Sequence, residues 1–240
     1  MNQEGRATIL WLTGWSMPNS VFDRLGGLLP DFDHVSVDYS EVTSSEELIE
    51  WTEQAANNIL STISGPLLIG GWSLGGILAI RLAAQGLADG LILFSTTAKF
   101  TRPKGQSHLG WADTYVRQMI AGLAKDRQAT EIKFWQMMFT ESEIDRTNPP
   151  LLGNWTTAAL IAGLEVLRSL DLLTQLPEIG ARVFLVHGIE DRICPYAAAE
   201  ELQRHLPQAQ LFSVAESGHA PFLGREANVA ESIRSWWHEQ

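Results

Sequence analysis

The strongest constraint on the fold of this chain is the segment Gly71-Trp72-Ser73-Leu74-Gly75-Gly76, which joins an apolar run to an apolar helical pattern. Residues 67–70 have the composition of a buried strand, and residues 74–85 have the pattern of a helix. A serine flanked by glycines at such a junction predicts a tight strand–turn–helix connection, in which the residues two positions from Ser73 must lack a side chain. The turn would lift the serine hydroxyl clear of the sheet, at the positive end of the following helix.

A glycine-rich turn between a strand and a helix can also cradle a phosphate group. That alternative requires a G-x-G-x-x-G or G-K-[ST] pattern, and neither occurs in the chain. We therefore interpret Ser73 as a candidate nucleophile.

Short apolar runs alternate with longer helical patterns along the chain, which is typical of a parallel sheet with crossover helices. The predicted strands are Ala7–Leu12, His34–Val37, Leu67–Gly70, Leu91–Phe94, Val183–Val186 and Gln210–Val214. The predicted helices of the main body are Ser44–Ile63, Leu74–Gln85, Tyr196–Leu206 and Ala227–Trp237. The fold class is therefore expected to be α/β, with a mostly parallel central sheet and helices on both faces.

Almost ninety residues separate the strand near Phe94 from the strand near Val183, too many for a structureless loop in a compact domain. Helical patterns fall at Asp113–Lys125, Ala129–Phe139, Trp155–Leu167 and Leu170–Leu176. We expect residues 99–170 to form an inserted helical lid, with residues 1–98 and 171–240 forming the core. Three tryptophans of this region could line an apolar channel or pack the lid against the body: Trp111, Trp135 and Trp155.

A serine hydroxyl needs an adjacent base, and the base needs an acid that orients it. Asp191 ends a short loop after a buried strand and is the expected acid, with Glu190 as the alternative. His219 follows the last strand and is the expected general base. His187 is its main rival, but it lies at a strand end beside a glycine, where a structural role is favoured.

The oxyanion of an acyl-transfer transition state needs two preorganised donors, normally backbone N–H groups. One is expected from Leu74, and the other from Trp15 in the loop after the first strand. Gly14 would let the backbone of that loop approach closely. The single cysteine, Cys194, excludes an internal disulfide and is interpreted as a small buried thiol, because no histidine is patterned with it.

The chain has 240 residues and a net charge of −11, which makes nucleic acids and anionic membranes improbable partners. Residues 99–160 nevertheless carry eight Lys or Arg and six Asp or Glu, a net +2. Such a stretch could bind an acidic partner or be an ordinary mixed surface. No metal or organic cofactor is expected, and a cytoplasmic location is predicted, since no secretory or membrane-spanning pattern occurs.

With these loops in place, the chain resembles the α/β-hydrolase superfamily over nearly its full length. Within it, the chain is similar to the pimeloyl-acyl-carrier-protein methyl ester esterases of biotin synthesis. That similarity rests on the elbow at Gly70–Gly76, on Gly14-Trp15, on Gly163-Leu164-Glu165-Val166-Leu167 with Asp171-Leu172, and on His219-Ala220-Pro221-Phe222.

The resemblance implies cleavage of a methyl ester at the far end of a pimeloyl chain borne on acyl carrier protein, an acidic partner bound through basic residues of the lid. It places Phe134 in an acyl channel that Trp15 also helps to form, with Lys133 and Arg146 near the carrier.

The chain departs from the usual family pattern at three places. Thr13 replaces the usual histidine of the oxyanion loop, Asp38-Tyr39-Ser40-Glu41 replaces a D-x-P-G-x-G loop, and the usual leading hairpin is expected to be lacking. Other α/β-hydrolase activities stay open at this point: a small-molecule esterase, a menaquinone-pathway lyase or a perhydrolase. A non-catalytic binding protein of the same fold is disfavoured by the complete set of Ser73, Asp191 and His219.

Overall fold

The computed structural model describes residues 5–144, 151–206 and 208–239. At its centre is a six-stranded sheet in the order β2-β1-β3-β4-β5-β6, and every neighbouring pair is parallel. The strands are β1 (Thr8–Leu12), β2 (Asp33–Ser36), β3 (Leu67–Trp72), β4 (Gly90–Phe94), β5 (Arg182–Gly188) and β6 (Ala209–Val214). All six predicted strands are confirmed, and the sheet is wholly rather than mostly parallel. In the described part of the chain, no strand precedes β1.

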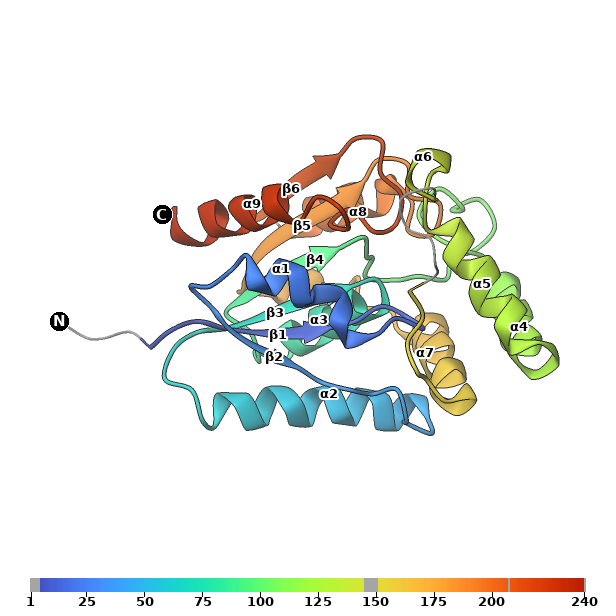
Figure 1. Ribbon diagram of the computed structural model, residues 1–240, viewed down its shortest axis with the longest axis horizontal. Coiled ribbons are helices and arrows are strands. Elements are labelled where there is room, and N and C mark those ends of the chain that lie inside the picture. Colours follow the sequence, from blue (N-terminus) through green and yellow to red (C-terminus); the bar gives the residue numbers. More distant parts are fainter. Residues whose placement is uncertain (1–4, 145–150, 207, 240) are drawn as a thin grey trace.

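Helices cover both faces of this sheet (Figure 1). One layer contains α1 (Asp23–Gly27) and α9 (Glu226–His238), which contact each other. The other contains α2 (Ser45–Leu60), α3 (Leu74–Ala84) and α8 (Tyr196–His205). The four predicted helices of the main body are therefore confirmed. The start of α2 is capped as its sequence suggests, because the Ser44 side chain accepts a hydrogen bond from the Glu47 N–H.

Four further helices lie between β4 and β5, beyond the carboxyl ends of the strands (Figure 1). They are α4 (Asp113–Lys125), α5 (Arg127–Met137), α6 (Glu141–Ile144) and α7 (Thr157–Ser169). Helix α4 packs against α5 and α7, and α7 in turn contacts α2 and α3 of the main body. Three predicted helices of this region are confirmed.

The prediction of a helix over Leu170–Leu176 was wrong. Leu170 is extended, the Leu172 N–H donates to the Ala98 carbonyl, and the Asp171 carboxylate accepts from the Leu173 N–H. These bonds satisfy the backbone in another way, so only the short 3-10 helix η2 (Leu176–Glu178) forms. The sequence pattern also missed η1 (Asn19–Phe22) and α1, where Gly26 and Gly27 weaken the helical signal.

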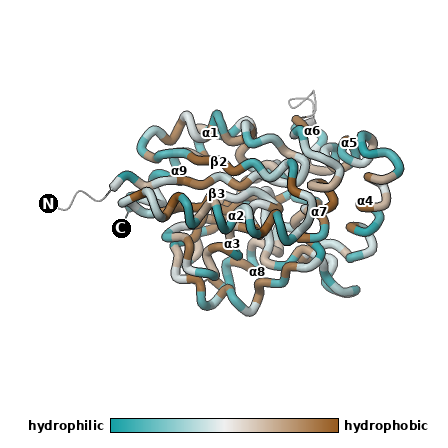
Figure 2. Tube along the Cα trace, turned by 90° about the horizontal axis from the view of Figure 1, so that it is seen from below, coloured by the Kyte–Doolittle hydropathy of each residue, from teal (hydrophilic) through white to brown (hydrophobic). Residues whose placement is uncertain are grey.

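The hydrophobic core is built on the inner strands. Every residue of β1, β3 and β4 is buried, as expected for parallel strands covered on both faces, whereas the edge strand β2 is exposed. Surface helices such as α2 alternate between hydrophobic and hydrophilic positions along their length (Figure 2). No helix in the described ranges is both long and apolar enough to cross a bilayer.

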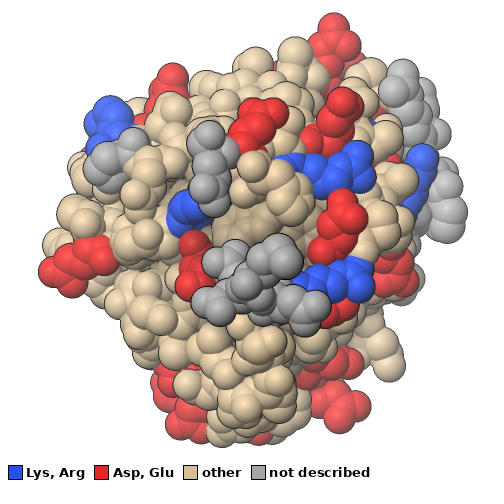
Figure 3. Space-filling view, turned by 90° about the vertical axis from the view of Figure 1, so that its left-hand side faces the viewer, with Lys and Arg blue, Asp and Glu red and all other residues tan. Residues whose placement is uncertain are grey.

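The face opposite α4 and α5 carries acidic side chains scattered among neutral ones, with basic side chains lying beside several of them (Figure 3). No continuous basic surface is visible among the described residues on this face. A mixed surface of this kind is unsuited to a polyanion.

Candidate active site

Ser73 occupies a sharp turn between β3 and α3, with backbone angles φ 55° and ψ −113°. A left-handed conformation is uncommon for a residue with a side chain and here points the hydroxyl away from the sheet. The flanking glycines are required by space. A Cβ at Gly71 would lie 2.4 Å from the Gly75 carbonyl oxygen, and one at Gly75 would lie 2.0 Å from the Leu12 carbonyl oxygen.

The Ser73 backbone is anchored on both sides. Its N–H donates to the Phe94 carbonyl at 3.0 Å, and its carbonyl accepts from the Thr96 hydroxyl at 2.8 Å. A Cβ at Gly76 would lie 2.5 Å from the Thr96 Cβ, so this close approach also depends on glycine. The strained turn is therefore held by its surroundings.

Three predicted side chains from separate parts of the chain form one hydrogen-bonded series. His219 Nε2 lies 2.8 Å from Ser73 Oγ, and His219 Nδ1 lies 2.8 Å from Asp191 Oδ2. All three residues are buried. With a proton on Nδ1 held by the carboxylate, Nε2 is left as an acceptor for the serine proton. This geometry is suited to withdrawing a proton from Ser73.

Asp191 is held by its own loop. Its Oδ1 accepts hydrogen bonds from the N–H groups of Ile193 at 2.8 Å and Cys194 at 3.0 Å. Burial would raise the pKa of this carboxyl, but the charge and hydrogen bond of His219, followed by His187, outweigh it and lower the pKa from its ordinary 3.8. Asp191 is thus an anion at neutral pH, and the alternative Glu190 is exposed.

His187 and Cys194 are buried beside this group. His187 Nε2 lies 2.8 Å from the Cys194 carbonyl and 3.5 Å from Asp191 Oδ2. Burial lowers the pKa of His187 from 6.5, although Asp191 and the carbonyl oppose this shift. Burial also raises the pKa of the Cys194 thiol well above its ordinary value, with Asp191 adding to the effect, so the thiol is a poor nucleophile.

The loop after β1 forms a tight turn, in which the Met17 N–H donates to the Gly14 carbonyl and Ser16 has φ 64°. The Trp15 side chain is buried and donates from Nε1 to the Leu160 carbonyl at 2.7 Å. Leu74 is the first residue of α3, where a backbone N–H has no acceptor within its helix. The two predicted oxyanion donors, Trp15 and Leu74, therefore come from a turn and a helix start.

Helix α7 packs closely against both of these residues. A Cβ at Gly163 would lie 2.9 Å from Leu74 Cδ2 and 2.9 Å from Trp15 Cδ1. The absence of a side chain at Gly163 therefore lets α7 approach the two candidate oxyanion residues. This contact gives a physical reason for a glycine in the Gly163–Leu167 segment.

The oxyanion loop is held by residues that the sequence did not mark as functional. The Tyr39 hydroxyl donates to the Thr13 carbonyl at 2.5 Å, so the unusual loop at Asp38–Glu41 supports the loop that contains Thr13. The Ser16 hydroxyl donates at 2.5 Å to Glu131 of α5, a buried carboxylate. Glu131 appears in the sequence only as an acid within a predicted helix, and nothing local pairs it with Ser16.

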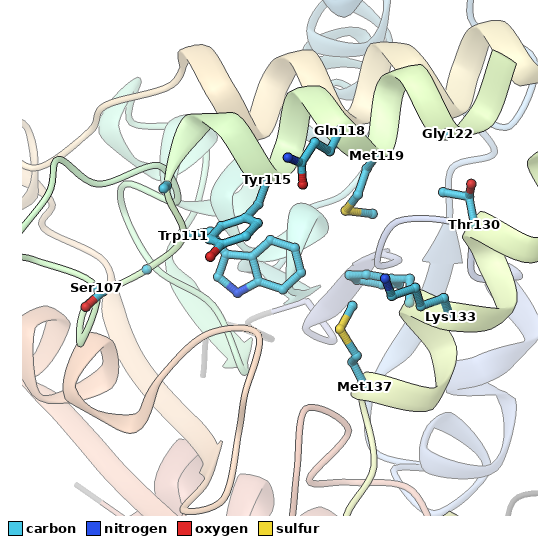
Figure 4. A pocket seen from close by; sticks show the side chains of 12 residues that line it. Ser107, Trp111, Tyr115, Gln118, Met119, Gly122, Thr130, Lys133 and Met137 are labelled. Atoms are coloured by element: carbon cyan, nitrogen blue, oxygen red, sulfur yellow. The ribbon is translucent and has the colours of Figure 1, made fainter. Parts of the chain in front are cut away.

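A cavity of about 600 Å³ lies between α4 and α5 (Figure 4). Trp111, Tyr115 and Met119 face it from one side, with Lys133 and Met137 on the other (Figure 4). Such dimensions and apolar lining are typical of small-ligand sites.

Phe134 connects this cavity to the loop that contains Trp15. It lines the cavity, and its ring packs edge-on against Trp15 with centroids 4.9 Å apart. Lys133, which was predicted near the carrier, also lines this cavity, while Arg146 lies outside the described residues. Of the three tryptophans, Trp111 lines this cavity, whereas Trp135 and Trp155 are largely buried and line two other, smaller cavities.

Several basic residues that contribute to the positive charge of residues 99–160 are neutralised by carboxylates. The pairs are Lys99–Asp171, Arg102–Glu201, Arg117–Asp113 and Arg127–Glu131. Lys104, Lys125 and Lys133 are exposed and have no ion pair within the described part of the chain. Fewer basic side chains of this segment are therefore without an ion pair than the count from the sequence suggests. No group of three or more potential metal ligands occurs among the described residues.

Comparisons with known proteins place the chain in a family. Residues 9–232 match the Alpha/beta hydrolase family. The chain belongs to the alpha/beta hydrolase family. This alpha/beta hydrolase is 32% identical to the pimeloyl-[acyl-carrier protein] methyl ester esterase of Nitrosomonas europaea, over 90% of this chain and 89% of that protein. It is 30% identical to the protein of the same name from Aromatoleum aromaticum, over 95% and 97% of the two chains.

The fold of this hydrolase is also found among solved structures. An esterase from Exiguobacterium antarcticum superimposes with a TM-score of 0.83, covering 97% of this chain and 92% of that one, at 22% identity. At that level of identity the likeness concerns the fold.

Proposed function

We propose that this alpha/beta hydrolase is a serine carboxylesterase that removes the methyl ester from a pimeloyl group carried on acyl carrier protein, in biotin synthesis. The chain is a carboxylic ester hydrolase, as its family and its esterase relatives support. The observation that carries the serine mechanism is the hydrogen-bonded series from Ser73 through His219 to Asp191.

In the first half of the reaction, Ser73 Oγ attacks the ester carbonyl carbon while its proton passes to His219 Nε2. The oxyanion that forms accepts hydrogen bonds from the backbone N–H groups of Trp15 and Leu74. The intermediate then collapses, the C–O bond to the methoxy group breaks, and methanol leaves with the proton that His219 returns. Asp191 stabilises the imidazolium in between, because its lowered pKa keeps it anionic.

In the second half, a water molecule gives a proton to His219 Nε2 and attacks the carbonyl carbon of the acyl-enzyme. Collapse of the second intermediate breaks the bond to Ser73, which recovers its proton from His219. The carboxylic acid product leaves and loses its proton to solvent. The side chains named here balance the reaction without a metal or organic cofactor.

The relatives named as pimeloyl-[acyl-carrier protein] methyl ester esterases support the choice of substrate. The apolar cavity lined by Phe134 would take the acyl chain, and the contact of Phe134 with Trp15 places the cavity beside the candidate oxyanion loop, toward which the far end of the chain would extend. The exposed Lys133 at this cavity, together with Arg146, would contact the acidic carrier.

We also propose that residues 99–170 act as a lid on a core formed by residues 1–98 and 171–240. The backbone bridge between Lys99 and Asp171, with the ion pair of their side chains at 2.6 Å, supports these boundaries because it closes the base of the segment. A cytoplasmic location is part of the same proposal. The lone buried Cys194 thiol suits a reducing compartment.

The test is hydrolysis of pimeloyl-acyl-carrier-protein methyl ester, beside a short p-nitrophenyl ester, by the wild type and by Ser73→Ala. We expect efficient, Ser73-dependent release of methanol from the carrier-bound ester. Cleavage of only the short ester would retain the serine mechanism and indicate a small-molecule esterase. Absence of Ser73-dependent turnover and of covalent labelling by a fluorophosphonate would contradict the mechanism and favour a binding protein.

A further inference from the structure

A buried carboxylate on α6 joins three segments that are distant in sequence. Glu143 Oε1 accepts hydrogen bonds from the Ser217 hydroxyl at 3.0 Å and from Arg225 Nη1 at 2.9 Å. Glu143 Oε2 accepts from the backbone N–H groups of Gly218 at 3.0 Å and Thr140 at 3.1 Å. The side chain is only 8% exposed. Glu143 therefore links the lid to the loop that ends in His219.

The same loop meets the lid at a second point, one residue along. The His219 N–H donates to the Met138 carbonyl at 2.6 Å. A Cβ at Gly218 would lie 2.3 Å from that carbonyl oxygen, so the contact is as close as the backbone permits. Two successive backbone N–H groups, of Gly218 and His219, are thus held by acceptors on the lid.

The catalytic geometry depends on where this backbone lies. His219 must reach Ser73 and Asp191 simultaneously, and both of its ring contacts are 2.8 Å long. A shift of the loop by a fraction of an ångström would lengthen one contact or the other, and misplacement of about 1 Å costs roughly 100-fold in rate. The acceptor of the Gly218 N–H is the Glu143 carboxylate of α6.

We propose that Glu143 is a positioning residue for the general base: it fixes the Ser217-Gly218 backbone from the lid, so that His219 is aligned with Ser73 and Asp191. This role presupposes the serine mechanism proposed above. It makes the lid a part of the catalytic apparatus, in addition to a cover over the substrate. The lid and the base then move together.

The chemistry of the side chain suits this role. Both carboxylate oxygens act as acceptors, and one faces the Arg225 guanidinium, which cannot accept a hydrogen bond. Burial would raise the pKa of Glu143, but the backbone N–H groups of Thr140 and Gly218, with Arg225 and Ser217, lower it, so the carboxylate is charged at neutral pH. An amide in its place would set an NH2 group against at least one donor.

The experiment compares Glu143→Gln with the wild type, using a short p-nitrophenyl ester and the rate of fluorophosphonate labelling of Ser73. We expect kcat and the labelling rate to fall about 10- to 100-fold, with KM within about threefold. Ser217→Ala removes one of the hydrogen bonds to Glu143, together with a longer one from Arg225, and should lower kcat in the same direction by a smaller factor. If Glu143→Gln does not fold, Ser217→Ala tests the positioning role in its place.

The matched control is Glu201→Gln. Glu201 is a buried carboxylate on α8 that pairs with Arg102 rather than with the loop that contains His219. We expect it to lower the melting temperature comparably while kcat stays within about twofold. The positioning role is overturned if folded Glu143→Gln or Ser217→Ala keeps the wild-type kcat, or if Glu201→Gln loses kcat equally. A failure of the serine mechanism can be told apart from a failure of the positioning role, because in the first case the wild type itself would lack Ser73-dependent turnover.

Discussion

The indole Nε1–H of Trp72 donates to the backbone carbonyl of His219 at 2.7 Å. Trp72 is the residue immediately before Ser73, so this bond couples the elbow to the loop that bears the candidate base. Both side chains are buried, with ring centroids 6.0 Å apart. The Trp72 side chain therefore helps to fix the position of one loop relative to the other.

Trp72→Phe should remove that bond and leave the buried His219 carbonyl without its donor. We expect the free energy of unfolding to fall by about 1–2 kcal/mol and kcat to fall about tenfold, because an unsatisfied buried acceptor is costly and the loop loses its register. Urea unfolding and ester hydrolysis measure the two effects. Trp11→Phe, which removes an indole bond to His34 instead, should cost stability without the loss in kcat.

Gly75→Ala should be far more disruptive than an ordinary glycine substitution. The new Cβ would lie 2.0 Å from the Leu12 carbonyl oxygen, so β1 or α3 must move. We expect a loss of more than about 3 kcal/mol in the free energy of unfolding, or no folded protein. Gly180→Ala is the control, since a Cβ there meets nothing within 4 Å, and wild-type-like stability in Gly75→Ala would contradict the steric account of the elbow.

Acidification should destabilise the protein through His187. Because burial lowers the pKa of His187 from 6.5, the unfolded state binds a proton that the folded state still excludes. The stability contribution of neutral His187 is therefore present above pH 6.5 and is lost as the pH falls below it. Asp191 acts in the same direction, but below its ordinary 3.8.

His187→Gln should flatten the dependence of the unfolding free energy on pH between 7 and 5, by up to about 1.4 kcal/mol per pH unit. Denaturant titrations at several pH values measure this slope. His108→Gln, at an exposed site, should leave it unchanged. An identical slope in wild type and His187→Gln would exclude His187 as the source.

Phe134→Ala should affect long acyl chains selectively, because Phe134 lies between the cavity and Trp15. Loss of an apolar contact of about 1–2 kcal/mol should raise KM for p-nitrophenyl octanoate about tenfold while KM for the acetate changes little. Phe212→Ala on the edge strand β6 controls for general destabilisation. An equal change in both KM values would place the acyl chain elsewhere.

Lys133→Glu combined with Arg146→Glu should slow the carrier-bound ester much more than a free ester. Charge reversal at a docking surface lowers the association rate with an acidic partner, and the difference should narrow at high salt. Steady-state kinetics at about 50 mM and about 500 mM salt measure this difference between the two esters. Arg204→Glu with Arg234→Glu applies the same change of charge on the main body, and an equal effect there would point to net charge alone.

The elements that the sequence predicts well are those whose cause is local. The elbow at Ser73 was predictable because the clash at Gly71, with the Gly75 carbonyl, arises within one turn. The inner strands were predictable because burial on both faces leaves an apolar run. The segment Leu170–Leu176 failed for the opposite reason. Its apolar pattern resembles a helix, but its backbone bonds to Ala98, more than seventy residues away.

The sequence by itself therefore determined the alternating α/β architecture, the serine at the strand–helix turn, and the order in which an acid and a histidine follow it. Only the tertiary structure decided which side chains hold those groups in place. Tyr39 supports the Thr13 carbonyl, Glu131 holds Ser16, and Glu143 holds Gly218. The physical reason is that a hydrogen bond is sensitive to tenths of an ångström between atoms, whereas sequence spacing across a hundred residues carries no such distance.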